Sequence, residues 1–181
     1  MKGLGITEIL YLSHRGFDEK LFTHRDSRVM DRFTKISVHV ARNLFASVRG
    51  QKISPQMVGV VIATNTGAYQ STVEFNSLLA KQGVAGVNPS KFPNVMLSTP
   101  LSRVVTELQV RGPSVPLYLG KYMEAAFQYS AVQILKGRCD GILMLYTNED
   151  RGCLGLFIER EESARERGLK TRFLLPWRET I

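Results

Sequence analysis

The sequence predicts an α/β fold, with a mostly parallel five-stranded sheet, one antiparallel strand and helices on both faces. Short apolar, β-branched runs alternate with segments whose apolar residues recur at helical spacing, as in parallel strands joined by helical crossovers. A short turn at 148–152 separates the last two runs, so we expect that pair to be antiparallel. With 181 residues, 44% of them hydrophobic, the chain 1–181 is expected to form a single domain with a sizeable core.

The first half of the chain supplies two strands and two helices. Ile6–Leu12 is the first strand candidate. A helix is predicted over Met30–Val48, because its apolar residues follow the spacing of one helix face: Met30, Phe33, Ile36, Val40, Leu44 and Val48. Val58–Thr64 is apolar, β-branched and too short for a helix, which indicates a strand buried on both faces. Ser71–Lys81 then predicts a second helix.

The second half continues the alternation after a loop rich in proline and asparagine. The loop surrounds Pro89 and Pro93, which punctuate the helical pattern. The elements expected after it are a helix at Leu101–Val110, a strand at Ser114–Leu119, a helix at Tyr122–Leu135, and strands at Gly141–Thr147 and Leu154–Glu159. The final charged run, Glu159–Arg172, mixes both signs and predicts an exposed helix with local ion pairs.

Neither a membrane span nor a secretion signal is evident in the sequence. No segment approaches about 20 uninterrupted apolar residues, and the N-terminus lacks a basic, then apolar, then small-residue pattern. We therefore expect a cytoplasmic protein. Its two cysteines, Cys139 and Cys153, adjoin apolar runs. We therefore expect both to be small buried side chains in a reducing compartment and not parts of a disulfide framework.

The order and spacing of several segments resemble the β-ketoacyl synthase family. Met30-Asp31-Arg32-Phe33-Thr34 is similar to the start of that family's first long helix, and Gly112-Pro113-Ser114-Val115 is similar to the turn before its nucleophile strand. Further similar segments are 58–67, 88–94, 136–144, 155–159 and 164–168. The resemblance implies one half, the N-terminal one, of a thiolase-like fold.

The same resemblance implies a cysteine at the start of the helix after strand Ser114–Leu119. Here Gly120 and Lys121 occupy that position. The family's two catalytic histidines come from its second half, and His14, His24 and His39 match neither. A lysine at a helix start opposes the helix dipole, whereas a thiolate or oxyanion is stabilised there. Three interpretations of Lys121 stay open. It is a solvated residue left after loss of an active site, or it contacts an acidic partner or a bound anion, or its amine is a nucleophile.

A formal net charge of +8 predicts attraction to anionic partners. In the resembling synthases, basic residues just before the Met-Asp-x-Phe sequence dock the acidic acyl carrier protein. Arg25 and Arg28 take those positions, and Arg32 extends the cluster. The alternative is an ordinary solvated cationic surface. Nucleic acid is not favoured, because basic and aromatic residues do not interleave and no nucleic-acid motif is present.

Members of the family form dimers through the strand that corresponds to 114–119. The resemblance therefore implies that this chain forms a homodimer or a heteromer through this strand. The residues expected at that interface are Ser114, Val115, Leu117 and Leu119. An exposed strand edge invites such pairing, because its N–H and C=O groups need partners.

Neither a cofactor nor a metal is expected. The turn Asn65-Thr66-Gly67 lacks the repeated glycines and the Lys-Ser/Thr pair of a phosphate-binding loop, and His14 and His24 have no companions at metal-ligand spacing. We expect a non-catalytic ketosynthase-like subunit, or a partner of acyl carrier protein, in fatty-acid or polyketide biosynthesis. Two alternatives stay open: a condensing or acyl-transferring enzyme completed by a partner subunit, and a basic scaffold unrelated to lipid synthesis.

Overall fold

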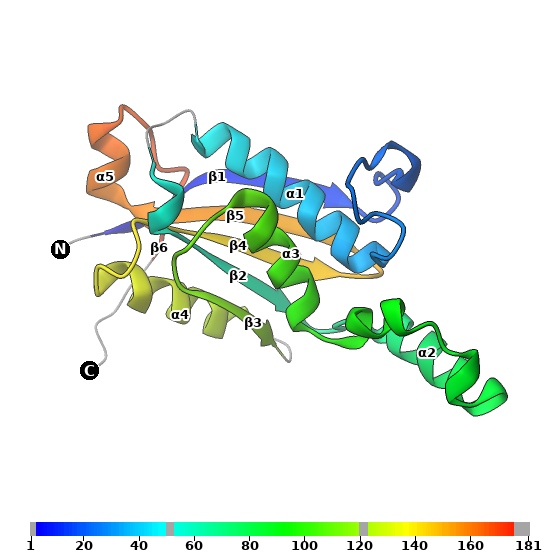
Figure 1. The fold of residues 1–181 in the computed structure, drawn as a ribbon. Coiled ribbons are helices and arrows are strands. Elements are labelled where there is room, and N and C mark those ends of the chain that lie inside the picture. The colour runs from blue at the N-terminus through cyan, green and yellow to red at the C-terminus, as the bar shows by residue number, and fades with distance from the viewer. Residues whose placement is uncertain (1–2, 50–52, 120–122, 176–181) are drawn as a thin grey trace.

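The computed structural model describes residues 3–49, 53–119 and 123–175 (Figure 1). Its strands are β1 (Leu4–Ser13), β2 (Val58–Thr64), β3 (Ser114–Tyr118), β4 (Gly141–Asn148), β5 (Gly152–Arg160) and β6 (Phe173–Leu175). Its α-helices are α1 (Arg32–Arg49), α2 (Tyr69–Gln82), α3 (Ser98–Leu108), α4 (Glu124–Leu135) and α5 (Glu161–Glu166). Four 3₁₀ helices are also described: η1 (Glu19–Leu21), η2 (Pro55–Met57), η3 (Val84–Gly86) and η4 (Pro89–Val95).

The strands form one sheet in the order β3-β2-β4-β5-β1-β6. β2 pairs in parallel with β3 and with β4, whereas β5 pairs antiparallel with β4 and with β1. Four of the five long strands therefore run in one direction and β5 runs against them, which confirms the predicted half of a thiolase-like fold. The sixth strand, β6, was not predicted; it has three residues and pairs antiparallel with β1 at the sheet edge.

Helices cover both faces of the sheet, as predicted, and each face has its own core. α1 and α3 lie together on one face, and α4 lies on the other (Figure 1). Side chains of β4 alternate between the two cores: Leu143 and Leu145 join the α1 side, and Ile142 and Met144 join the α4 side. Because a central strand buries both faces, its sequence is an almost continuous apolar run.

The turn before β3 depends on two glycines that bring backbones into close approach. A Cβ on Gly112 would lie 2.5 Å from the Val58 carbonyl carbon, and one on Gly59 would lie 2.2 Å from the Pro113 oxygen. The Gly112 amide donates to the Val58 carbonyl at 2.9 Å. Only residues without a Cβ fit here, which explains the glycine of the Gly-Pro-Ser turn and fixes the start of β3 against β2.

The charged run near the C-terminus folds differently from the prediction. Instead of one exposed helix over Glu159–Arg172, only Glu161–Glu166 is α-helical, and Glu159 is a fully buried residue of β5. Its carboxylate accepts a hydrogen bond from Thr7 Oγ1 at 2.7 Å and pairs with Arg167. β5 is buried on both of its faces, and the charge of Glu159 is tolerated there because the Arg167 guanidinium and the Thr7 hydroxyl are its partners.

α2, η3 and η4 form an arm that projects from the body of the molecule (Figure 1). α2 packs on η3 and on η4, and the rings of Phe75 and Phe92 meet with centroids 5.5 Å apart. Within the described residues, no helix has both the length and the apolarity that a membrane crossing requires.

Candidate functional site

The junction where the resemblance places a nucleophile is only partly described, because Gly120 and Lys121 lie outside the described residues. The strand that leads to them is firmly held. Leu119, the last described residue before the junction, is buried, and its amide donates to the Thr64 carbonyl at 2.7 Å. The end of β3 is therefore fixed beside the end of β2.

The turn after β2 is closed by its own side chains. Thr64 Oγ1 accepts hydrogen bonds from the Gly67 amide at 2.9 Å and from the Thr66 amide at 3.2 Å. Asn148 Oδ1 accepts from the Asn65 amide at 3.1 Å. Since these amides are already satisfied within the protein, they do not form a phosphate cradle, and the structural interpretation of this turn holds. Gly67 supplies the positive φ of 60° that the turn requires.

Both cysteines are buried and free, as the sequence predicted. Burial raises the pKa of the Cys153 thiol to about 12, although a hydrogen bond with Thr147 works in the opposite direction. Burial, together with the nearby Asp140, raises the pKa of Cys139 to about 11. Neither thiol is the accessible, low-pKa thiolate that a nucleophile needs.

The three histidines lie in structural roles. His14 Nδ1 accepts from Arg32 Nε at 3.3 Å. His24 Nδ1 accepts from the Asp26 amide at 3.0 Å, which leaves Nε2 to carry a proton toward Glu107 at 3.2 Å. Burial lowers the pKa of His39, and the charge of Arg42 lowers it further. Across the described residues, no three His, Cys, Asp or Glu side chains gather as metal ligands would.

The sequence-predicted basic residues differ sharply in their surroundings. Arg25 and Arg28 are exposed, and the Arg25 side chain is 79% accessible. The Arg32 guanidinium is instead held by the carboxylate of Glu19 at 2.7 Å and by the carbonyls of His14 at 2.7 Å and Phe17 at 3.0 Å. Two of the three arginines can thus meet a partner directly, while Arg32 holds the segment 14–19 that leads into the loop that carries them.

Glu19 is the centre of this anchor. It accepts from Arg32 Nη1 and from Lys35 Nζ, each at 2.7 Å. Burial tends to raise the pKa of its carboxyl, but the hydrogen bonds and charges of Lys35 and Arg32 outweigh burial, so the pKa is lowered. We call residues 22–29 the basic loop. Its entrance is fixed by ion pairs to α1, so its arginines are presented by an ordered backbone.

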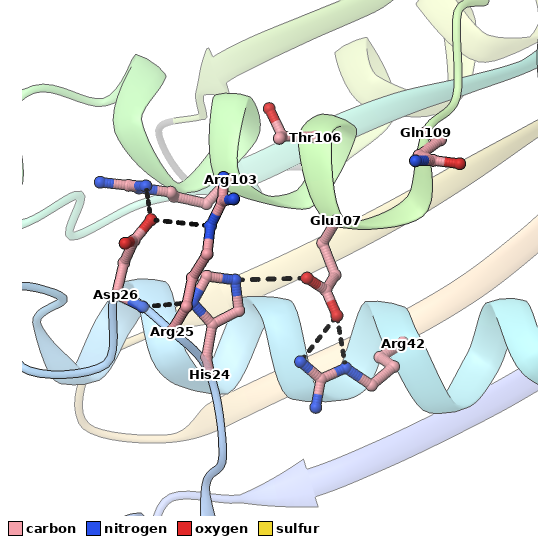
Figure 2. Close-up of a pocket in the computed structure, with 8 residues that line it drawn as sticks. All are labelled: His24, Arg25, Asp26, Arg42, Arg103, Thr106, Glu107 and Gln109. Atoms are coloured by element: carbon pink, nitrogen blue, oxygen red, sulfur yellow. Dashed lines mark hydrogen bonds and ion pairs between the residues drawn. The ribbon is translucent and has the colours of Figure 1, made fainter.

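The basic loop borders an open hollow of about 490 Å³ between α1 and α3 (Figure 2). Glu107 pairs with Arg42 at 2.7 Å and with His24, and Asp26 pairs with Arg103 (Figure 2). The lining residues are His24, Arg25, Asp26, Arg42, Arg103, Thr106, Glu107 and Gln109. Of these, only Arg25 was predicted to lie in a site, since partners 65 and 77 residues apart leave no local signal in the sequence.

β3 is an edge of the sheet among the described strands, as the sequence predicted. β3 pairs in register with β2, and the Leu119 amide donates to the Thr64 carbonyl. Because alternate residues of a strand turn their backbone N–H and C=O groups to the same side, those of Val115 and Leu117 also face β2. The backbone groups of Ser114, Pro116 and Tyr118 therefore face the open edge. Pro116 has no N–H, so the edge lacks one donor at its centre.

Comparison with known proteins identifies the fold of this chain but not its family. No family model and no curated protein matches the chain. A solved structure described as a type II polyketide-synthase acyl-carrier protein in complex with its ketosynthase matches with a TM-score of 0.83 and 15% identity, over 97% of this chain and 68% of that one. The ishigamide ketosynthase/chain length factor matches with a TM-score of 0.73 and 14% identity, over 90% and 62%.

A third solved structure is a ketosynthase in complex with its chain length factor from Xenorhabdus doucetiae. It matches with a TM-score of 0.63 and 12% identity, over 88% of this chain and 79% of that one. The chain thus spans 68% and 62% of the first two solved chains. The predicted resemblance is confirmed at the level of the fold, and the chain has the fold of a ketosynthase-like half-domain.

Proposed function

We propose that this chain is a non-catalytic ketosynthase-like subunit in polyketide or fatty-acid assembly, and that it binds an acidic acyl carrier protein through Arg25 and Arg28. The observation that carries the proposal is the basic loop: two exposed arginines on a loop whose entrance Arg32 and Glu19 hold in place. An ordered cationic surface binds an acidic protein at a smaller entropic cost than a flexible one.

The solved structures with a similar fold support a partner of this kind. One is a carrier protein in complex with its ketosynthase, and others pair a ketosynthase with a chain length factor. The net charge of +8 adds a long-range attraction toward an acidic partner, which raises the rate of encounter.

Three features of the chain support the non-catalytic part of the proposal. Gly120 and Lys121 stand where the family has its cysteine, both cysteines of the chain are buried with raised thiol pKa values, and its histidines match no catalytic motif of the family. A thiol in either place would need to leave the core before it could attack an acyl group.

Titration calorimetry with a purified acyl carrier protein tests the docking. Arg25→Glu combined with Arg28→Glu should weaken binding more than tenfold, and binding by the wild type should weaken as salt rises. The matched control is Arg165→Glu on α5, because its side chain is 77% exposed against 79% for Arg25. Equal affinity of the wild type and the double variant would remove Arg25 and Arg28 from the docking surface.

A turnover assay tests the non-catalytic assignment. The purified chain, given an acylated carrier protein and an extender, should release no condensation product. Measurable turnover that Lys121→Ala abolishes would replace the proposal with the alternative of an enzyme that uses a lysine nucleophile.

A further inference from the structure

The hollow between α1 and α3 has the composition of a site for a small polar anion. Its volume of about 490 Å³ lies within the range of small-molecule sites. Every residue that lines it has a polar or charged side chain, so an apolar ligand such as an acyl chain would find no matching contact there. Three lining arginines, Arg25, Arg42 and Arg103, face the two carboxylates of Asp26 and Glu107, which leaves one positive charge in excess.

Arg42 and Glu107 hold each other in place on one side of the hollow. Arg42 directs Nε and Nη2 at Glu107, at 2.9 and 2.7 Å, and donates from Nη1 to the carbonyl of Thr23 at 3.2 Å. Its guanidinium also lies 5.8 Å from the centroid of the Phe22 ring. The second oxygen of Glu107 is held by His24. Because these groups are ordered before a ligand arrives, binding loses little of its free energy to their immobilisation.

Arg25 and Arg103 have donors left for a ligand. They reach Asp26 from two different elements, the basic loop and α3 (Figure 2). Arg103 bonds to Asp26 through Nη1, which leaves Nε and Nη2 for other acceptors. The Arg25 nitrogen nearest to Asp26 is 3.7 Å away, which is too far for a hydrogen bond. Two guanidiniums with remaining N–H groups at one hollow are an arrangement that binds the oxygens of a phosphate.

Gln109, at the end of α3, has a backbone conformation that a residue with a Cβ disfavours. Its φ of 54° is the only positive φ of a non-glycine residue in the described part of the chain. It is the C-cap of α3, and glycine is the usual residue where a helix ends in the left-handed conformation. Packing does not explain the glutamine, because Gln109 is exposed. A side chain retained at a disfavoured backbone position indicates a role for that side chain, and Gln109 lines the hollow (Figure 2).

The polar groups that α3 contributes suit the hydroxyl groups of a ligand. Among residues 3–49, 53–119 and 123–175, neither the Thr106 hydroxyl nor the Gln109 side-chain amide has a partner. Both groups donate and accept hydrogen bonds, as a sugar or polyol hydroxyl does. The carboxylates of Asp26 and Glu107 repel a second anionic group but accept from hydroxyls. The ligand should therefore carry one anionic group, near Arg25 and Arg103, and hydroxyl groups elsewhere.

We propose that the hollow binds a small, hydroxyl-rich metabolite with one phosphate group, of the class of the sugar and polyol phosphates. Arg25 and Arg103 bind the phosphate, while Thr106, Glu107 and Gln109 bind the hydroxyl groups. The inference goes beyond the proposed function and does not rest on it, because Arg103, Thr106 and Gln109 have no part in the proposed docking of a carrier protein.

Titration calorimetry at low salt tests the site, with the monophosphates of glycerol, ribose and glucose as probes. The wild type should bind at least one of them more tightly than it binds inorganic phosphate. Arg103→Gln should weaken that binding about tenfold, because it removes a charged donor. The matched control is Arg151→Gln, which should bind as the wild type does. Arg151 also pairs with an aspartate, Asp150, but lies between β4 and β5 and outside the lining of the hollow.

Gln109→Gly separates a role in binding from a role in stability. Glycine removes the side-chain amide but suits the backbone conformation, so binding should weaken about threefold while the Tm of the free chain stays the same or rises. A lower Tm in this variant would show that the glutamine holds the end of α3, and would count against its place in the site.

Each result of the titrations decides the inference. Binding that is weakened in Arg103→Gln and Gln109→Gly and kept in Arg151→Gln supports it. Equal affinity in all four forms would place the ligand elsewhere and overturn it. Inorganic phosphate bound as tightly as the three probes would reduce the hollow to an unspecific anion site, against the proposal. No binding of any of the three probes would also overturn it, and the proposed function would stand in each case.

Discussion

Two consecutive elements of this chain, β2 and α2, have opposite relations to the rest of the molecule. All seven residues of β2 are buried, whereas all 14 residues of α2 are at least partly exposed. β2 has a strand on each side and a helix layer on each face, while α2 packs mainly on its own arm and bonds to the body at its first turn, through Gln70 and Ser71 (Figure 1). The contrast separates the part of the sequence that holds the fold together from the parts that are free to bind partners.

The largest effect should follow from opening a cavity in the body. Phe157 of β5 is fully buried, and Phe157→Ala should lower the free energy of unfolding by about 3–5 kcal/mol, because it removes a ring from close packing. Val84→Ala on the arm should change it by less than about 0.5 kcal/mol. Chemical denaturation of both variants measures the difference, and similar losses would mean that the arm is part of the folding core.

Arg32 should have an intermediate effect, because it belongs to the body but supports the basic loop. Arg32→Ala removes one of the two donors to the Glu19 carboxylate and takes a donor from the carbonyls of His14 and Phe17, which should cost about 2 kcal/mol of stability. Carrier binding should weaken as well, although Arg32 itself is held inward. Arg25→Ala is the matched variant, and it should weaken carrier binding while leaving the denaturation midpoint unchanged.

The ion pairs of Glu19 predict a smaller and pH-dependent effect. The pKa of Glu19 is lowered from its ordinary value of 4.5, so the group stabilises the fold above that value and loses its contribution as the pH falls through the folded-state pKa. Glu19→Gln should therefore be less stable than the wild type by about 1 kcal/mol at pH 7. The two midpoints should converge as the pH falls through the folded-state pKa of Glu19, and a gap that persists once this carboxyl is protonated would show that packing, and not charge, is responsible.

The smallest effect concerns the open edge of the sheet. Pro116→Ala restores an N–H at the centre of β3, and the stability of the monomer should hardly change because this group faces outward. Self-association, measured by sedimentation at increasing concentration, should increase. If the alanine variant stayed as monomeric as the wild type, the proline would have no role in protecting this edge.

The body of the fold could be predicted because burial leaves a direct pattern in the sequence. β2 begins and ends at the predicted residues, Val58 and Thr64, because both of its faces select apolar, β-branched side chains. Glu159 marks the limit of that approach. It was predicted both as the last residue of a strand and as the first residue of an exposed, charged helix. The structure places it in β5, and only the structure shows the Arg167 and Thr7 partners that make its burial possible.

The surfaces could be predicted only in part. Arg25 and Arg28 were found from their position before the Met-Asp-x-Phe sequence, and both are exposed. The pairing of Arg42 with Glu107 across the hollow was not found, because the two residues lie on different helices. The helix at Ser71–Lys81 was predicted, but an amphipathic pattern does not tell whether its apolar stripe faces the protein's own core or a partner.

The central claim, that the basic loop docks an acidic acyl carrier protein, is tested most directly by chemical-shift mapping. The ¹⁵N-labelled chain is titrated with unlabelled carrier protein at low salt. The account predicts saturable shifts centred on Arg25 and Arg28, which disappear when the salt concentration is raised. Shifts confined to other surfaces, or no shifts with a carrier in excess, would contradict it.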